Sequence, residues 1–433
     1  MHKLVMSGRA VSRQSRYPYA VLAVLALTYV LNFADRQILT VLIEPVKAEL
    51  HLSDTVIGLL TGTAFALFYV TIGIPIGWLA DRYNRIRIVA AACLAWSLFT
   101  AACGVAGTAL QLALARMGVG VGEAGCTPPA LSLVSDYFPE ARRAFAVSIY
   151  TAGGPIGVFL GTALGGWIAA LFDWRTAFLV IACFGVVVAP LLLLVVREPQ
   201  RGRLDEEYTS SHQPESLLVT ARRFYRYPSL GFLAIACGCS AFVGYGLLNW
   251  LPAFLMRIRT MSVQDVGIYY GVVAGLTLAF GTLLGGVIVS RYCQRYPRAY
   301  ALVPAVGFLV AAPLFAAAIH MPSWPLTLAL IVLPLILINM FVGPALALIQ
   351  NLVPPNARST TSAMLMLVLN LIGLGGGPYA VGAISDWLAP VHGTHSLKFA
   401  MLSLAPAMLL AALAHYAVSR CVERDLARAA TEA

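Results

Sequence analysis

Four charged residues interrupt long apolar stretches of the sequence, and they are the residues best placed to do chemistry. Asp35 and Arg36 lie in one stretch, and Arg116 and Glu123 lie in another. A charged side chain costs about 2.5–3.5 kcal/mol at the centre of a membrane-spanning helix, so such charges usually face one another or a water-filled cavity. The four residues therefore predict one shared polar site.

Helical spacing supports this prediction if the two stretches cross a membrane in opposite directions. Arg116 and Glu123 are seven residues apart, which is two turns along one helix face. Asp35 and Arg36 point about 100° apart, so at most one of them aims directly at the same partner. We expect Asp35 and Arg116 to form an ion pair, with Glu123 near the middle of the membrane.

Two interpretations of this site follow. Burial favours the neutral form of a carboxyl group, and a nearby guanidinium favours the charged form. Movement of Arg116 would then switch Asp35 between binding and releasing a proton, and Asp35, Glu123 and Arg116 would be the proton-coupling residues. The alternative is a static ion pair that locks two helices together, which is a costly way to pack them.

The composition indicates an all-α integral membrane protein. Of 433 residues, 60% are apolar and only 11% are charged, which is too few charges for a water-facing surface. The apolar runs approach or exceed the ~20 residues that a spanning helix needs, whereas spanning strands are shorter and alternate. The net charge of +10 is spread over short patches between apolar runs, so we do not expect nucleic acid as a partner.

The apolar runs predict twelve membrane-spanning helices with both termini in the cytoplasm. With this orientation the cytoplasmic segments hold 22 Lys and Arg residues and the outer loops hold five, as the positive-inside rule requires. We therefore expect a multi-pass protein of the inner (plasma) membrane. The predicted spans are 18–43, 54–80, 86–106, 109–138, 142–170, 175–196, 229–256, 265–290, 299–320, 324–352, 358–388 and 397–419.

A long polar segment divides these spans into two lobes of six helices each. The halves also repeat in detail: Gly77 and Gly286 begin similar helix ends, and Pro139 and Pro354 lie in similar loops. Two repeats of equal orientation are typical of two-lobed transporters. The predicted parts are an N-terminal tail (1–17), an N-terminal lobe (18–196), a central loop (197–228), a C-terminal lobe (229–419) and a C-terminal tail (420–433).

Charged residues also cluster where the second span meets the predicted cytoplasm. Arg82 or Arg85 can pair with Asp136, and Asp81 can accept hydrogen bonds at the start of the eleventh span, near Arg358. The alternative is positive-inside charge alone. The predicted cytoplasmic gate comprises Gly77, Asp81, Arg82, Arg85, Asp136, Arg142 and Arg358.

Several of these segments resemble a known family. GWLADRYNRIR (77–87) resembles the loop signature of the major facilitator superfamily, and LNFADRQIL (31–39) and RMGVGVGEAGCTPPALSLVSDYFP (116–139) resemble Spinster-type transporters within it. The resemblance implies the major facilitator fold, gate contacts that latch the two lobes, and proton coupling through Asp35, Arg36, Arg116 and Glu123.

The second half of the chain carries no comparable cluster of buried charges. Its polar candidates are Asn249, Asn339 and Asn370, among many aliphatic and aromatic residues. Ions on one wall and apolar surface on the other would suit an amphiphile, bound by Arg36, Arg116, Glu123 and the three asparagines. The alternative is that each asparagine only makes hydrogen bonds between helices.

We therefore predict a proton-coupled secondary transporter that works by alternating access, and the resemblance implies a lysophospholipid- or sphingolipid-like substrate. The alternatives are a proton-coupled multidrug or organic-anion carrier, a channel and, remotely, a membrane enzyme acting on lipid, for which we find no nucleophile or metal motif. We expect membrane lipids as partners, a monomer, no metal and no cofactor other than protons. The glycines at every fourth position from Gly153 to Gly165 predict close helix packing.

Overall fold

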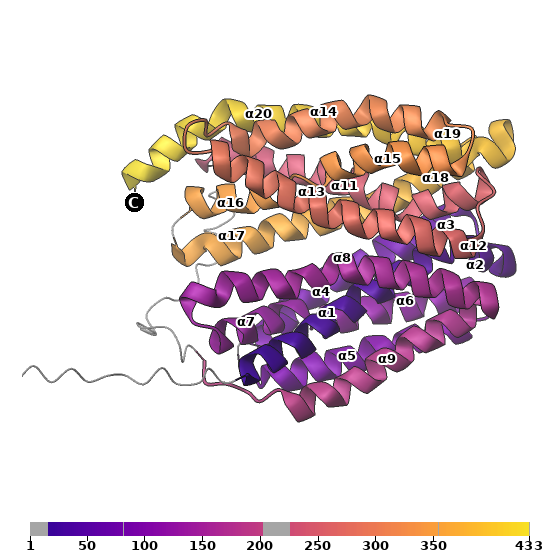
Figure 1. Ribbon diagram of the computed structural model, residues 1–433, viewed down its shortest axis with the longest axis horizontal. Coiled ribbons are helices and arrows are strands. Elements are labelled where there is room, and N and C mark those ends of the chain that lie inside the picture. The colour runs from indigo at the N-terminus through magenta and orange to yellow at the C-terminus, as the bar shows by residue number, and fades with distance from the viewer. Residues whose placement is uncertain (1–15, 81, 202–225, 354, 433) are drawn as a thin grey trace, which may run out of the picture.

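The computed structural model describes residues 16–80, 82–201, 226–353 and 355–432, and within these ranges it contains helices and no strands. Residues 17–195 form one bundle of helices and residues 228–432 form a second, which lie side by side (Figure 1). We call these bundles the N-lobe and the C-lobe. The all-helical prediction is confirmed.

The N-lobe begins with a helix whose first turn contains Pro18, where the missing N–H costs nothing. Its helices are α1 (Tyr17–Val41), α2 (Ile43–Leu50), α3 (Asp54–Gly58), η1 (Leu59–Thr63), α4 (Ala64–Ala80), α5 (Arg85–Val105), α6 (Ala109–Glu123), α7 (Thr127–Tyr137), α8 (Glu140–Leu171) and α9 (Trp174–Val195).

The C-lobe repeats this plan. Ser53 caps the start of α3, and Ser262 caps the start of its counterpart α12. Its helices are α11 (Pro228–Arg257), α12 (Val263–Asp265), η2 (Val266–Tyr270), α13 (Gly271–Tyr292), α14 (Ala299–His320), α15 (Trp324–Ile338), α16 (Val342–Leu352), α17 (Pro355–Val368), η3 (Leu369–Gly376), α18 (Gly377–His392), η4 (Gly393–His395), α19 (Ser396–Leu402) and α20 (Leu404–Glu432).

Two predicted spans are broken in the structure. Span 109–138 divides into α6 and α7 directly after Glu123, and span 324–352 divides into α15 and α16 at Asn339. In both cases a proline follows the break, at Pro128 and Pro344. A proline has no N–H for the carbonyl four residues earlier, so each helix ends before it and a new one starts.

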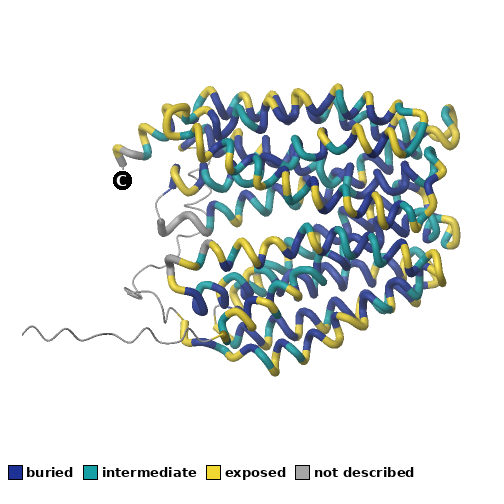
Figure 2. The backbone as a smooth tube through the Cα atoms, in the orientation of Figure 1, coloured by how far each residue is buried: buried dark blue, intermediate teal, exposed yellow. Residues whose placement is uncertain are grey.

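Within the described residues, ten helical stretches are long and apolar enough to cross a membrane. Neither α6 nor α7 reaches that length alone, and the last two predicted spans merge into one stretch, Thr360–Ala429. The count of twelve and the cytoplasmic termini therefore stay predictions. Many residues on the outer faces of the helices are exposed (Figure 2). Many of them are large and apolar, among them Leu194 at 82% exposure, as a protein solvated by lipid requires.

Glycines let α1 and α8 approach closely. A methyl group on Gly157 would lie 2.4 Å from the carbonyl oxygen of Val30, and one on Gly161 would lie 2.3 Å from that of Ala34. The prediction of a packing role for this glycine stripe is confirmed. The close contact matters for function because it holds Asp35, the next residue in α1, against the rest of the N-lobe.

We expect Gly161→Ala to destabilise the folded protein by about 1–3 kcal/mol, because the added methyl group must push α1 away from α8. Gly286→Ala is the matched control, since a methyl group there meets nothing within 4 Å. It should be neutral or slightly stabilising, because alanine favours helix more than glycine does. Thermal unfolding of both variants in detergent measures the difference, and equal midpoints would contradict this packing role.

The lobes touch along one half of α8 and separate along the other. At Pro155, Phe159 and Gly166, α8 packs against α13, η2 and α12 of the C-lobe. About two and three turns nearer its start, at Ser148 and Phe145, the same side of α8 is exposed. The lobes therefore close at the end that holds α3 and α12 and part toward the end that holds the C-terminus (Figure 1).

The last helix extends beyond its predicted end. Helix α20 continues through the predicted tail 420–433 as far as Glu432. Asp425 anchors this extension, because its carboxylate accepts hydrogen bonds from the backbone N–H and the hydroxyl of Ser229, and Val422 is buried beside it. The segment is thus a helical extension that packs against the C-lobe. Most of the predicted central loop, residues 202–225, lies outside the described residues.

Candidate functional site in the N-lobe and contacts between the lobes

The four predicted charges meet in the centre of the N-lobe. Asp35, Arg116 and Glu123 are at most 2% exposed, and Arg36 is 13% exposed. Helix α1 supplies the first acid and base, and α6 supplies the second. We call these four residues the buried charge cluster.

Asp35 and Arg116 face each other, as predicted, but they do not touch closely. The Nη1 atom of Arg116 lies 3.9 Å from Oδ2 of Asp35, which is beyond hydrogen-bond distance. The other carboxylate oxygen, Oδ1, lies 2.5 Å from the hydroxyl of Thr100 on α5. This hydroxyl also lies 2.9 Å from the carbonyl oxygen of Trp96. Asp35 is therefore held mainly by Thr100, which the sequence analysis did not identify.

Arg36 and Glu123 form the second and tighter pair. Nε of Arg36 lies 2.5 Å from Oε2 of Glu123. Glu123 is the last residue of α6, where the helix dipole disfavours an anion, so Arg36 supplies the compensating positive charge. Asp35 and Arg36 are adjacent in the chain, and each faces a different charged residue of α6.

Aromatic rings surround the guanidinium groups. The Arg36 guanidinium lies 5.0 Å from the centre of the Phe65 ring and 4.8 Å from that of Tyr69. The Arg116 guanidinium lies 5.4 Å from the same Phe65 ring. The two ion pairs therefore act as one cluster, with Phe65 lying against both cations.

Several polar atoms of the cluster have no hydrogen-bond partner among the described residues. They include Oδ2 of Asp35, Oε1 of Glu123, and Nε and Nη1 of Arg116. Asn32, one turn before Arg36 and 1% exposed, has no partner for either atom of its amide. Buried polar groups are almost always paired, so unpaired ones point to a bound water, a proton or a functional role.

The three asparagines predicted to bind substrate lie in the C-lobe and not beside the buried charge cluster. The side-chain amides of Asn249, Asn339 and Asn370 each donate to the carbonyl oxygen four residues earlier in their own helix. These bonds are within helices, whereas the alternative predicted bonds between helices. Asn339 lies at the break between α15 and α16, and Asn370 lies in the π-helical segment η3.

One contact of the predicted gate is present. Arg85 is 1% exposed, and its Nη1 lies 2.6 Å from Oδ2 of Asp136. Its Nε lies 2.7 Å from Glu198, just beyond α9, a partner that the sequence analysis did not predict. Neither contact involves the C-lobe. They tie the start of the central segment to the turn between α4 and α5.

The other gate residues make local contacts or lie outside the described structure. Arg82 stacks on Trp78, with its guanidinium 3.9 Å from the ring centre, and Arg142 contacts the hydroxyl of Tyr19 at 3.4 Å. Gly77 has open space where a side chain would be. Asp81 and the side chain of Arg358 lie outside the described residues, so the predicted contact between them stays a prediction.

A second charged network joins the lobes at the end where they touch. Arg257 at the end of α11 makes a fork of bonds to Asp54 on α3, with Nη1–Oδ2 at 2.7 Å and Nη2–Oδ1 at 2.9 Å. The same Nη2 lies 2.7 Å from Glu44 on α2, and Lys47 also pairs with Asp54. Asp54 is 2% exposed, so these bonds are largely shielded from solvent.

The C-lobe also caps helix α3 of the N-lobe. The carboxylate of Asp386 on α18 accepts hydrogen bonds from the backbone N–H groups of Asp54, at 3.0 Å, and Thr55, at 2.7 Å. The hydroxyl of Ser385 donates to Oδ2 of Asp54 at 2.7 Å. We call this network the interlobe latch. Its residues are Glu44, Lys47 and Asp54 in the N-lobe and Arg257, Ser385 and Asp386 in the C-lobe.

Comparison with known proteins identifies the family. The family model for the Major Facilitator Superfamily matches residues 25–378. The chain belongs to this superfamily. It is 35% identical to an MFS-type efflux pump of Mycolicibacterium smegmatis, and the match covers 95% of each chain. It is 32% identical to human protein spinster homolog 1, over 85% of this chain and 73% of the human protein.

A solved structure is similar over almost the whole chain. It is the crystal structure of a bacterial homologue of the human lysosomal transporter Spinster, in an inward-facing and unoccupied conformation. The TM-score is 0.87 at 32% identity, over 94% of this chain and 98% of that chain. This chain is therefore a Spinster-type transporter of the major facilitator superfamily, with that fold, and it is not an enzyme.

The sequence analysis of this Spinster-type transporter missed the interlobe latch. Arg257 directly follows the predicted span 229–256, and Asp54 and Asp386 lie at the ends of predicted spans. A usable signal was present, because the three acids and two bases of the latch all lie at or near span ends on the predicted outer side. Their pairing across the lobes depends on tertiary contacts that no spacing along the chain reveals.

Proposed function

We propose that this transporter is driven by protons and that the buried charge cluster binds them. The observation that carries the proposal is the open contact between Asp35 and Arg116, at 3.9 Å with unpaired polar atoms on both residues. A purely structural ion pair needs excellent geometry to offset the cost of burying its charges. A pair that must form and break during transport does not need close hydrogen-bond geometry in every conformation.

Thr100 supplies a simple way for Asp35 to change its protonation state. A hydroxyl has one proton to donate and two lone pairs to accept with. When Asp35 is ionised, Thr100 donates to it. When Asp35 is protonated, it donates to Thr100, and Thr100 turns its own proton to the carbonyl oxygen of Trp96. Neutral Asp35 then has no charge to attract Arg116, so one of the two ion pairs between α1 and α6 is lost.

We propose an amphiphilic, lipid-like substrate, such as a lysophospholipid or a sphingolipid-like molecule. Arg36 is the most exposed member of the cluster, and its guanidinium lies against aromatic rings, which suits a polar head group beside an apolar chain. Arg36, Arg116, Glu123, Asn249, Asn339 and Asn370 are the proposed substrate contacts. This substrate class is the one that the resemblance of residues 31–39 and 116–139 to Spinster-type transporters implies.

A multidrug or organic-anion carrier is the second candidate, and one observation favours it. The efflux pump of Mycolicibacterium smegmatis is 35% identical over nearly the full length of both chains. For either substrate, we propose a monomer in the inner membrane that works by alternating access. The similarity to an inward-facing structure and the closed interlobe latch support an inward-facing state here.

Transport into liposomes tests this proposal. Purified protein is reconstituted, and the uptake of a fluorescent lysophospholipid or of ethidium is followed with and without an imposed pH gradient. We expect the gradient to raise accumulation in the wild type, and Asp35→Asn to reduce that gain by about tenfold or more, because the variant cannot exchange the proton.

Asp173→Asn is the matched control. Asp173 is exposed and caps α9 by accepting a hydrogen bond from the N–H of Thr176, which lowers the pKa of this carboxyl. Asparagine caps helices equally well, so this variant should transport like the wild type. Full gradient-driven accumulation by Asp35→Asn would overturn proton coupling through Asp35. The probe that accumulates distinguishes the two substrate classes.

A further inference from the structure

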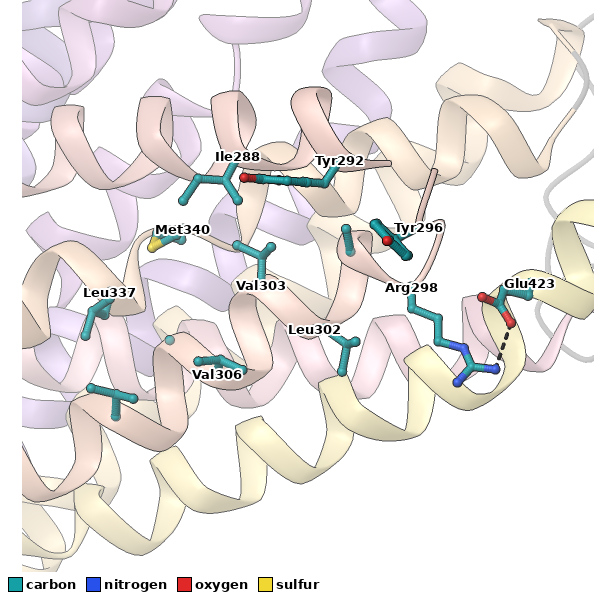
Figure 3. A pocket seen from close by; sticks show the side chains of 13 residues that line it. Ile288, Tyr292, Tyr296, Arg298, Leu302, Val303, Val306, Leu337, Met340 and Glu423 are labelled. Atoms are coloured by element: carbon teal, nitrogen blue, oxygen red, sulfur yellow. Dashed lines mark hydrogen bonds and ion pairs between the residues drawn. The ribbon is translucent and has the colours of Figure 1, made fainter. Parts of the chain in front are cut away.

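An apolar groove lies on the C-lobe, away from the buried charge cluster. It has a volume of about 550 Å³, within the ~300–1,000 Å³ usual for small-molecule sites. Helix α14 forms its floor. In the described part of the chain its main packing partners all belong to the C-lobe: α13, α15, α16, α19 and α20. Figure 3 shows the labelled side chains of Ile288, Val303 and Met340 on either side of it.

The groove has one polar end and is apolar elsewhere. Arg298 lies at that end, with Nη2 at 2.8 Å from Oε2 of Glu423, and both side chains are about half exposed (Figure 3). Tyr292 and Tyr296 lie at the same end and are exposed, as tyrosines at a membrane–water boundary often are. From there the lining continues along α14 through Val306 to Val310.

The length of the groove matches one leaflet of a membrane. Arg298 and Val310 are twelve residues apart on α14, which corresponds to about 18 Å at 1.5 Å per residue. Half of the ~30 Å hydrocarbon core is ~15 Å. Val306 is 55% exposed and Val310 is 42% exposed, so the groove opens sideways toward lipid rather than into the protein.

The charge around the polar end is positive. Near Glu423, the only other described acid in this part of α20 is Asp425, which is buried and bonded to Ser229. Six exposed arginines lie at the end of α13, in the α13–α14 connection and at the end of α20, and one of them, Arg424, lies 3.5 Å from Asp425. They are Arg291, Arg295, Arg298, Arg420, Arg424 and Arg428.

We propose that this groove binds an anionic phospholipid of the membrane, with one acyl chain along α14 and the phosphate at Arg298. The lipid is a bound partner and not the transported substrate. The phosphate replaces Glu423 as the partner of Arg298, so the carboxylate of Glu423 competes with the lipid for the guanidinium.

Because of this competition, substitutions at Arg298 and at Glu423 should change lipid binding in opposite directions. Delipidated protein is titrated with phosphatidylglycerol or with phosphatidylcholine of the same acyl chains, and bound lipid is counted by native mass spectrometry. We expect phosphatidylglycerol to bind more tightly. Arg298→Gln should weaken its binding about fivefold, and Glu423→Gln should strengthen it by a similar factor.

A third variant tests the acyl-chain position. Val306→Trp fills the groove and should reduce binding of phosphatidylglycerol, whereas Val187→Trp, on an exposed face of the N-lobe, should not. Thermal unfolding shows whether each variant is folded. Equal binding of the two lipids, or weaker binding after Glu423→Gln, would overturn the proposal. If Val306→Trp does not fold, the two charge variants decide it alone.

Discussion

Replacing Glu123 by glutamine should destabilise the transporter by about 3–5 kcal/mol, because it leaves the Arg36 guanidinium buried without an anion. Replacing Arg36 by glutamine should have a smaller effect that depends on pH. An arginine cannot release its proton, but a buried carboxylic acid can take one up and become neutral. The Arg36→Gln protein should therefore regain stability as the pH falls, and the Glu123→Gln protein should not.

The direction in which stability changes with pH follows from the charge that the substitution leaves unpaired. In Arg36→Gln the unpaired group is the carboxylate of Glu123, so the folded state binds a proton more readily than the unfolded chain, and stability rises with acidification. Thermal unfolding of both variants between about pH 8 and about pH 5 measures this difference. If the stability of the two variants changes with pH in the same way, the result contradicts the pairing of Arg36 with Glu123.

A surface pair provides the control for these two variants. Nη1 of Arg175 lies 2.6 Å from Oε1 of Glu49, but the two side chains are 28% and 52% exposed. Glu49→Gln and Arg175→Gln should each change stability by less than about 1 kcal/mol, because exposed ion pairs contribute little. A large effect in this control would mean that removing any charge disturbs the protein.

Replacing Arg257 by alanine should open the interlobe latch. The substitution removes the fork of bonds to Asp54 and the contact with Glu44 and leaves Asp54 with Lys47 and Ser385 as its remaining side-chain partners. We expect hydrogen exchange in α2 and α3 to become about tenfold faster, since the closed state loses much of its stabilisation.

Arg259→Ala is the matched control for the latch. Arg259 is two residues away on the same connection, but it donates to the carbonyl oxygen of Ile319 within the C-lobe. Its removal should leave exchange in α2 and α3 unchanged. Arg257→Lys should restore protection only in part, because a lysine cannot form the two-pronged bond. If Arg257→Ala and Arg259→Ala give the same exchange rates, the latch does not hold the lobes together.

The sequence predicted the parts of this structure that depend on local pattern. Long apolar runs place the helices, and the cost of burying charge places Asp35 and Arg116 opposite each other, since few other partners exist inside the membrane. The spacing of Gly153, Gly157, Gly161 and Gly165 predicted the close contact of two helices. Each of these inferences requires only the residue types and the helical repeat.

Features that depend on tertiary contacts were not predictable in this way. The break after Glu123 needs the effect of Pro128 on a particular carbonyl, and Thr100 reaches Asp35 only because α1 and α5 both pack against α9. Arg36 was expected to face substrate, yet it also pairs with Glu123. The interlobe latch joins residues of the two halves of the chain, and hydrophobic patterning carries no information on which loop charges will meet.

The proposed mechanism depends on a link between the proton on Asp35 and the arrangement of the lobes. Distances between spin labels at positions 51 and 394 measure this link, because both positions are exposed, lie in different lobes and flank the interlobe latch. The labels are attached to introduced cysteines after the accessible native ones are replaced. We expect acidification to change the populations of short and long distances in the wild type and to leave those of Asp35→Asn unchanged. The same pH response in both proteins would contradict it.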